Sequence, residues 1–271
     1  MGRKLRRDIE GGWHHVMNRG IDHQPVFLAA GDARLFLWLM GEAAELRGVE
    51  VHAYCLMENH YHLLVHCPEG GLSEFMQRVG ARYTRAVNTR VARDGPLFRG
   101  RFHSILIDSP EYLDLVGRYI HRNPLDVRPA VPLDRYRWSS FGAYVGAASS
   151  PEWLRTDVLE AMHADRYAMR TFVEGNLAPM RVTAAMPWAI KLAVSELDHE
   201  ALGIANSAQV ERTVALALLD GSSVEVQQSV SALLGELTDG ARRTALSRAR
   251  RRVADQPWMA DILGRVRHLA A

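Results

Sequence analysis

The sequence has few of the residues that mark several common classes of protein. Its two cysteines, Cys55 and Cys67, are not paired as CxxC, which excludes a disulfide scaffold and a paired-cysteine zinc site. No apolar run approaches the ~20 residues of a membrane-spanning helix, and no apolar stretch of signal-peptide length follows the charged N-terminus. The patterns HExxH and GxxxxGK[ST] are missing too, which disfavours a zinc protease and a P-loop nucleotidase. We therefore expect a cytoplasmic protein without a membrane partner.

Lysine is also scarce, and it occurs only at Lys4 and Lys191, although Lys and Arg together number 33. The planar guanidinium of arginine suits phosphate, but a genome rich in G and C would favour arginine as well. The formal net charge of +2 identifies no partner. The 271 residues, of which 48% are hydrophobic and 24% charged, are typical of a folded globular protein with one large or two small domains.

Hydrophobic periodicity predicts an alternation of strands and helices in the first half of the chain. The expected strands cover 13–18, 51–56, 60–67 and 103–107, and the expected helices cover 32–47, 73–93 and 109–123. This order, β-α-β-β-α-β-α, predicts an α+β fold in which the helices pack on one side of a sheet. We expect this first domain to span 1–148.

The rest of the sequence predicts helices, with a connector at 149–207 and a helical C-terminal region at 208–271. Residues 222–253 can form a helix, a turn at Leu237–Gly240 and a second, basic helix that carries Arg242, Arg243 and Arg248. This segment distantly resembles the helix-turn-helix DNA-binding domain of the bacterial replication initiator. A plain helical bundle with an arginine-rich outer face fits the same residues.

Two histidines, His60 and His62, lie two residues apart in a predicted strand. Residues i and i+2 of a strand point to the same face, so both imidazoles can hold one cation. Tyr119 and Asn123 lie four residues apart on a predicted helix and share its face, where they offer a phenol and a neutral oxygen ligand. Taken alone, the histidines also fit surface positions, Tyr119 a core position and Asn123 a helix end before Pro124.

Three separated blocks of sequence remove much of this ambiguity. They are Met57-Glu58-Asn59-His60-Tyr61-His62-Leu63-Leu64, Gly95-Pro96-Leu97-Phe98-Arg99-Gly100-Arg101-Phe102 and Arg118-Tyr119-Ile120-His121-Arg122-Asn123-Pro124, with Trp138-Ser139-Ser140 beyond them. In this order they resemble the HUH single-tyrosine transposases, especially the REP-associated tyrosine transposases. The resemblance covers about half of the chain, and it departs at Glu58, where that family often has proline.

The resemblance implies a ferredoxin-like HUH domain with an antiparallel sheet. It implies that His60, His62 and Asn123 hold a divalent metal, Mg²⁺ or Mn²⁺. Tyr119 would attack a DNA phosphodiester, form a 5′-phosphotyrosine and free a 3′-OH for later strand transfer. The expected partner is single-stranded or hairpin DNA, of the REP type or similar, and the expected place is the nucleoid. The chain would act as a monomer or a homodimer.

Tyr83 is the rival nucleophile, because it lies on a helix with several arginines, but no candidate metal ligand is at helical spacing from it. Tyr61 is expected to point away from His60 and His62. Candidate DNA contacts are Arg82, Arg85, Phe98, Arg99 and Arg101, since arginine pairs with phosphates while an aromatic ring stacks on a base. A solvated helix face with a core phenylalanine explains them as well.

Two other functions remain as alternatives. A non-catalytic, sequence-specific DNA-binding regulator could retain the fold, although the presence of Tyr119, His60, His62 and Asn123 together speaks against it. A metalloenzyme of another class, such as a zinc hydrolase, lacks the usual motifs.

Overall fold

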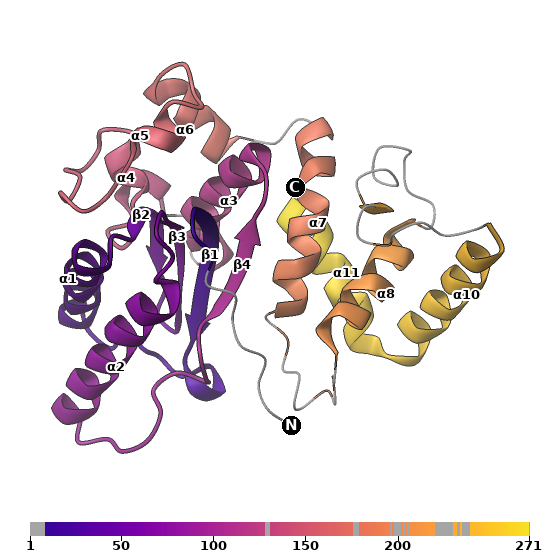
Figure 1. The fold of residues 1–271 in the computed structure, drawn as a ribbon, viewed down its shortest axis with the longest axis horizontal. Coiled ribbons are helices and arrows are strands. Elements are labelled where there is room, and N and C mark those ends of the chain that lie inside the picture. The colour runs from indigo at the N-terminus through magenta and orange to yellow at the C-terminus, as the bar shows by residue number, and fades with distance from the viewer. Residues whose placement is uncertain are drawn as a thin grey trace. The chain divides into compact units, whose positions relative to one another are not determined.

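The computed structural model describes residues 9–127, 131–175, 179–195, 197, 202, 204, 206–219, 230–231, 234 and 239–270. The chain forms two compact units, Met1–Gly175 and Asn176–Ala271 (Figure 1). The boundary lies inside the stretch 149–207 that the sequence predicts as a connector. Each unit is described by itself.

The first unit is built on a four-stranded antiparallel sheet. Its strands are β1 (Gly12–Arg19), β2 (Glu50–Leu56), β3 (His60–Cys67) and β4 (His103–Ile107), in the spatial order β2-β3-β1-β4. With α1 (Ala30–Arg47) between β1 and β2, and α2 (Leu72–Arg90) between β3 and β4, the topology is ferredoxin-like. The α+β prediction is confirmed.

One face of the sheet packs against α1 and α2 and forms the main hydrophobic core. Strand alternation sends Val16, Tyr61 and Leu63 to this face, where they join one buried cluster with Phe36 of α1 and Phe75 of α2. Helix α1 ends at Gly48, whose φ of 62° is the left-handed conformation that glycine adopts without strain.

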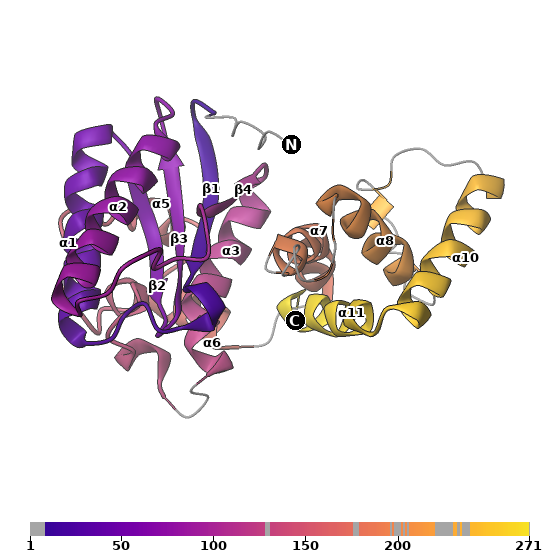
Figure 2. The same cartoon turned by 90° about the horizontal axis from the view of Figure 1, so that it is seen from below.

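The opposite face of the sheet packs against α3 (Pro110–Arg122), which contacts β2, β3 and β4 (Figure 2). The expectation that all helices share one side is therefore wrong for this helix. Both faces of β3 are largely buried. A strand of this kind can be covered by helices on either face, so its sequence does not predict on which side α3 packs. Helix α3 begins as predicted, with Pro110 in its first turn and the Ser109 hydroxyl accepting a hydrogen bond from the Tyr112 amide at 3.2 Å.

The segment after α3 covers the edge strand β2. It contains the short helices η2 (Asn123–Asp126), η3 (Leu133–Arg135), α4 (Phe141–Tyr144), α5 (Asp157–Glu160) and α6 (Arg166–Glu174). One further short helix, η1 (Ile21–His23), follows β1. The Leu56 amide donates to the Trp138 carbonyl at 2.8 Å, and the Arg155 amide donates to the Val51 carbonyl at 2.9 Å. These bonds use backbone groups that an edge strand would otherwise expose.

In the second unit, the secondary structure of the described residues is helical, as predicted. Its helices are α7 (Pro179–Ser195), α8 (Ser207–Leu219), α10 (Asp239–Asp255) and α11 (Pro257–Ala270), with α7 in contact with α8 and α11. Most of the first helix expected for a helix-turn-helix, and part of the turn at Leu237–Gly240, lie outside the described residues. None of the helices in the described part of the chain is both long and apolar enough to cross a membrane.

Candidate functional site

The first element of the site is His60, at the start of β3. Its Nδ1 lies 2.7 Å from Oδ1 of Asn59, and Nδ2 of Asn59 donates to the His23 carbonyl at 3.1 Å. The second bond fixes the Asn59 amide so that its oxygen faces His60. Because that oxygen only accepts, His60 Nδ1 must carry the proton, and Nε2 is left with the lone pair in the neutral ring.

Asn123, at the C-terminal end of α3, approaches that same nitrogen. Its Oδ1 lies 3.0 Å from Nε2 of His60, and its side chain is buried, with 3% exposed. Two lone-pair atoms at this separation repel each other unless a proton or a cation lies between them. The pair therefore fits a metal ion, and the bond from His60 Nδ1 to Asn59 is the kind of support that orients a ligating imidazole.

His62 is directed in a similar way by His15 of β1, a residue that the sequence analysis did not select. Nε2 of His15 lies 2.9 Å from Nδ1 of His62. Complete burial lowers the pKa of His15 to about 3, so its ring is neutral and can accept from His62 Nδ1. Strand alternation could have indicated His15. It lies two residues from Met17, which pairs with His62, so His15 and His62 face the same side of the sheet.

Tyr119 of α3 completes the group. Its ring centroid lies 5.3 Å from that of His62 and 5.7 Å from that of His15, both in edge-on contact. The side chain is half-buried, so the tyrosine remains accessible from outside. Thus the structure brings the pair His60 and His62 of β3 together with the pair Tyr119 and Asn123, which lies more than fifty residues later in the sequence.

The residues that flank Tyr119 hold α3 in place. Arg118 donates to the carbonyls of Phe172 at 2.9 Å and Gly175 at 2.7 Å, which ties α3 to the end of α6. On the other side, Nε2 of His121 lies 2.9 Å from the Ser140 hydroxyl, which also accepts from the Tyr54 amide of β2 at 2.9 Å. Arg118, His121 and Ser140 thus hold the helix that carries Tyr119.

The rival tyrosines lie elsewhere. Tyr83 is fully buried, its hydroxyl donates to the Val26 carbonyl at 2.6 Å, and burial raises its pKa well above the usual range. A phenol in this environment is neither accessible nor readily ionised. Tyr61 points into the α1/α2 core and contacts Phe36 and Phe98, as its place in the strand predicts.

The predicted DNA contacts on α2 are not brought to Tyr119. Arg82 pairs with Glu42 and lies 5.4 Å over the ring of Trp38, and Arg85 is exposed on the same helix. Helix α2 covers the face of the sheet opposite α3. Phe98 is 8% exposed within the core cluster, which leaves little ring surface on which a base could stack.

Arg99 and Arg101 lie nearer to the histidines. Arg101 is exposed and Arg99 half-exposed, and the Arg99 amide donates to the Arg19 carbonyl at 3.0 Å. Arg19 is paired with His60 across β1 and β3, so this segment and His60 share one end of the sheet. In the second unit, Arg243 and Arg248 are exposed on α10 and Arg242 is partly buried.

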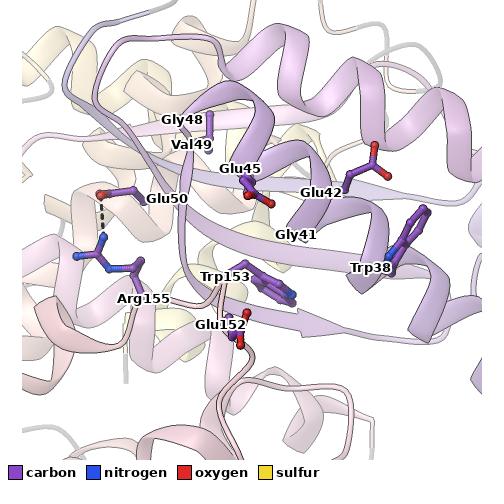
Figure 3. Close-up of a pocket in the computed structure, with 11 residues that line it drawn as sticks. Trp38, Gly41, Glu42, Glu45, Gly48, Val49, Glu50, Glu152, Trp153 and Arg155 are labelled. Atoms are coloured by element: carbon purple, nitrogen blue, oxygen red, sulfur yellow. Dashed lines mark hydrogen bonds and ion pairs between the residues drawn. The ribbon is translucent and has the colours of Figure 1, made fainter.

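The first unit also contains a cavity of about 650 Å³ between α1, the start of β2 and the segment around Trp153 (Figure 3). It is lined by Trp38, Gly41, Glu42, Ala44, Glu45, Gly48, Val49, Glu50, Glu152, Trp153 and Arg155. None of the predicted catalytic or metal-binding residues is among them. Its acidic lining does not suit a nucleic acid.

The first unit contains a stretch that is similar to a known protein family. Residues 11–123 match the family model described as "Transposase IS200 like". This stretch lies within the first unit and covers less than half of the chain. The matched stretch contains Tyr119, His60, His62, Asn123 and the unpredicted His15, whereas the motif at Trp138 lies beyond it.

Comparison with curated proteins gives no match. A solved structure of a REP-associated tyrosine transposase bound to a REP hairpin resembles 58% of this chain and 93% of its own, with 19% sequence identity and a TM-score of 0.47.

Proposed function

We propose that the protein is a metal-dependent, single-tyrosine DNA nuclease and strand-transferase. Two neighbouring contacts carry this proposal. The ring centroids of Tyr119 and His62 are 5.3 Å apart, and Nε2 of His60 lies 3.0 Å from Oδ1 of Asn123. A candidate nucleophile and three candidate metal ligands thus lie together, within the residues that match the IS200-like family model.

His60, His62 and Asn123 would hold the divalent ion, with open positions for a phosphate. Two imidazoles and an amide oxygen suit Mn²⁺, and Mg²⁺ would accept the oxygen together with water and phosphate oxygens. When bound, such an ion polarises the scissile phosphate and offsets the negative charge that develops on its oxygens.

Tyr119 would act as the nucleophile. Its phenolic oxygen attacks the phosphorus, the bond from phosphorus to the 3′ oxygen breaks, and the DNA downstream stays attached as a 5′-phosphotyrosine. The phenol loses a proton and the departing 3′ oxygen gains one, so the step is balanced without an added reactant. The covalent bond keeps the energy of the phosphodiester, and a 3′-OH can later attack it to join strands.

The DNA partner is proposed to be single-stranded or hairpin DNA, including REP-type hairpins. Arg99 and Arg101 share the His60 end of the sheet and can pair with phosphates near the cleaved bond. Arg82 and Arg85 would contact DNA only if it extends around to α2. Arg242, Arg243 and Arg248 give α10 a basic surface that suits additional phosphates.

The test uses hairpin DNA from the genomic surroundings of the gene, labelled at its 3′ end, with Mg²⁺ or Mn²⁺. We expect the wild-type protein to retain label on a denaturing gel, and the Tyr119→Phe variant to retain none. Tyr83→Phe is the matched control, and it should label normally. Binding of the hairpin without any adduct would instead favour a DNA-binding regulator.

A further inference from the structure

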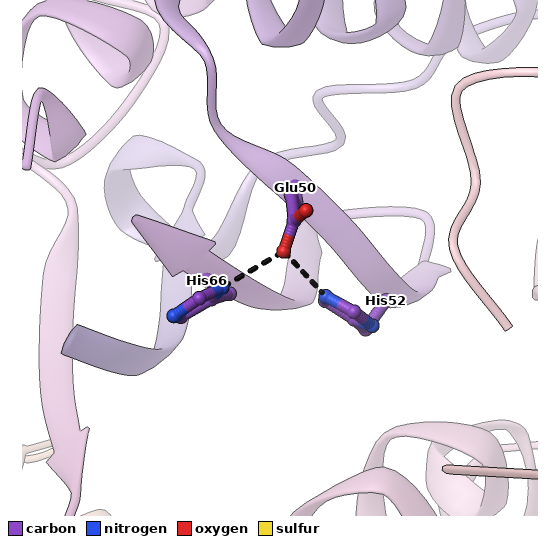
Figure 4. Close-up of side chains that lie close together, drawn as sticks. All are labelled: Glu50, His52 and His66. Carbon is purple, nitrogen blue, oxygen red and sulfur yellow. Dashed lines mark hydrogen bonds and ion pairs between the residues drawn. The ribbon is translucent and has the colours of Figure 1, made fainter. Parts of the chain in front are cut away.

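Three side chains of the first unit gather at the end of the sheet away from Tyr119. Glu50 and His52 belong to β2 and His66 belongs to β3, and one ligand atom from each lies within 4.8 Å of the other two (Figure 4). Oε2 of Glu50 lies 2.8 Å from Nδ1 of His66 and 3.6 Å from Nε2 of His52. We refer to these residues as the β2–β3 cluster.

Strand alternation and cross-strand pairing create this arrangement, next to a bulge in β2. Val51 pairs with Val65 and Ala53 with Leu64, so His52 is the extra residue of the bulge. Glu50 and His52 are two residues apart, so strand alternation places both on one face of β2, and Glu50 pairs with His66 across the two strands. The bulge shifts the alternation after His52, so that Tyr54 faces the core with Leu63.

His52 is the member that most needs a partner. Its side chain is 0% exposed, and among the described residues its ring nitrogens make no hydrogen bond, although Nε2 lies 3.6 Å from Oε2 of Glu50. A buried polar group without a partner carries a free-energy cost.

Glu50 is oriented by Arg155, whose guanidinium lies 3.2 Å from Oε1, and Arg155 in turn pairs with Asp157 at 3.1 Å. The first contact leaves Oε2 for the histidines, in the manner of an outer-shell partner of a metal ligand. The Asp157 carboxylate offsets the positive charge of Arg155. Trp13 stacks on His66 at 4.5 Å between ring centroids and limits its rotation.

We propose that Glu50, His52 and His66 form a second metal site, which binds Zn²⁺ or a cation of similar preference. Two imidazoles and one carboxylate are zinc ligands, and three protein ligands leave one position for water. A hard ion such as Mg²⁺ prefers oxygen ligands and is disfavoured here.

This site is independent of the proposed catalytic site. His66 and His60 lie on the same strand, six residues apart, which is about 20 Å in a β-strand. Glu50 and His66 are 30% and 20% exposed, so an ion can enter from solvent. Bound there, it would fasten the bulge of β2 to the end of β3.

The test measures zinc binding by the full chain after removal of metals, in a His60→Gln background that weakens the proposed catalytic site. Titration in competition with a chromophoric chelator should give about one zinc per chain. Glu50→Gln and His66→Gln should each weaken binding by at least about 100-fold, the upper end of the effect of losing an outer-shell partner. His163→Gln, a histidine paired with Asp114 at 3.0 Å, is the matched control and should bind as before.

A second measurement does not depend on a loss of binding. In a His66→Cys variant loaded with Co²⁺, a thiolate-to-cobalt absorption band should appear, because the new thiolate would ligate the ion. The His163→Cys variant should show no such band. The proposal is overturned if the His60→Gln protein, folded by circular dichroism, binds no zinc, if Glu50→Gln and His66→Gln bind as tightly as their background, or if His66→Cys gives no cobalt–thiolate band.

Discussion

Asn59 offers a sharp test of how the proposed catalytic metal site is organised. Its oxygen lies 2.7 Å from His60 Nδ1, and its amide nitrogen is held by the His23 carbonyl. The Asn59→Ala substitution leaves all three proposed ligands in place but removes the group that fixes the His60 tautomer. Loss of such a partner typically weakens metal binding 10–100-fold, and we expect Asn59→Ala to cost about 1.4–2.8 kcal/mol of binding free energy.

The assay is a Mn²⁺ titration in which the signal of the unbound ion is followed by electron paramagnetic resonance. It is carried out in a Glu50→Gln background, so that the β2–β3 cluster does not contribute. Asn88→Ala is the matched control, because it also removes a bond from an asparagine side chain to a backbone carbonyl, that of Gly95 at 2.8 Å. A change in Kd below about threefold, or under about 0.7 kcal/mol, with the fold intact, would refute the role given to Asn59.

Three further predictions concern the core and the DNA contacts. Tyr83→Phe should lower the free energy of unfolding by about 1–3 kcal/mol in urea, because it leaves the buried Val26 carbonyl without its donor; an unchanged stability would contradict this. Burial raises the pKa of Tyr54 from 10.0 to about 12, so the unfolded chain loses this proton first, and stability should fall between pH 10 and 12 by up to about 2.7 kcal/mol. Tyr54→Phe should reduce that alkaline loss in equilibrium unfolding, and an identical pH profile would rule the explanation out. Arg101→Ala should reduce the salt dependence of single-strand binding by about 0.7 in the log–log slope, more than Arg85→Ala, and the reverse order would move the DNA path to α2.

Much of the fold was predictable because local signals agree with the final structure. The strand at 60–67 has the bounds of β3, and Ser109 and Pro110 fix the start of α3 as their chemistry predicts. The position of α3 on the opposite face was not predictable in the same way. It depends on tertiary contacts such as that of His121 with Ser140, which joins α3 to a segment that also holds β2.

The sequence predicted which residues form the proposed site, but it did not predict how their side chains contact one another. Spacing along one strand and one helix selected His60, His62, Tyr119 and Asn123, but it could not show that His15 supports His62, because that contact crosses from β1 to β3. The β2–β3 cluster was missed for a related reason. Glu50 and His52 share a face by their spacing of two residues, but the pairing that sets His66 beside Glu50 crosses from β2 to β3.

The arginines illustrate the limit of clustering in sequence. The run from Arg78 to Arg101 reads as one basic region, but the structure divides it between α2 and the end of the sheet near His60. On α2, Arg78 and Arg82 share Glu42, and Arg90 pairs with Asp32. Charge density along the chain therefore overstates the basic surface near Tyr119.

The most direct test of the central claim is to locate the covalent bond to DNA. Wild-type protein is incubated with single-stranded hairpin DNA and Mn²⁺, digested with nuclease and trypsin, and analysed by mass spectrometry. Cleavage after Arg118 and Arg122 releases the tetrapeptide that contains Tyr119. The account predicts a nucleotide attached through its 5′ phosphate to Tyr119 in this tetrapeptide, dependent on the metal. A nucleotide on another tyrosine, or one attached through its 3′ phosphate, would contradict it.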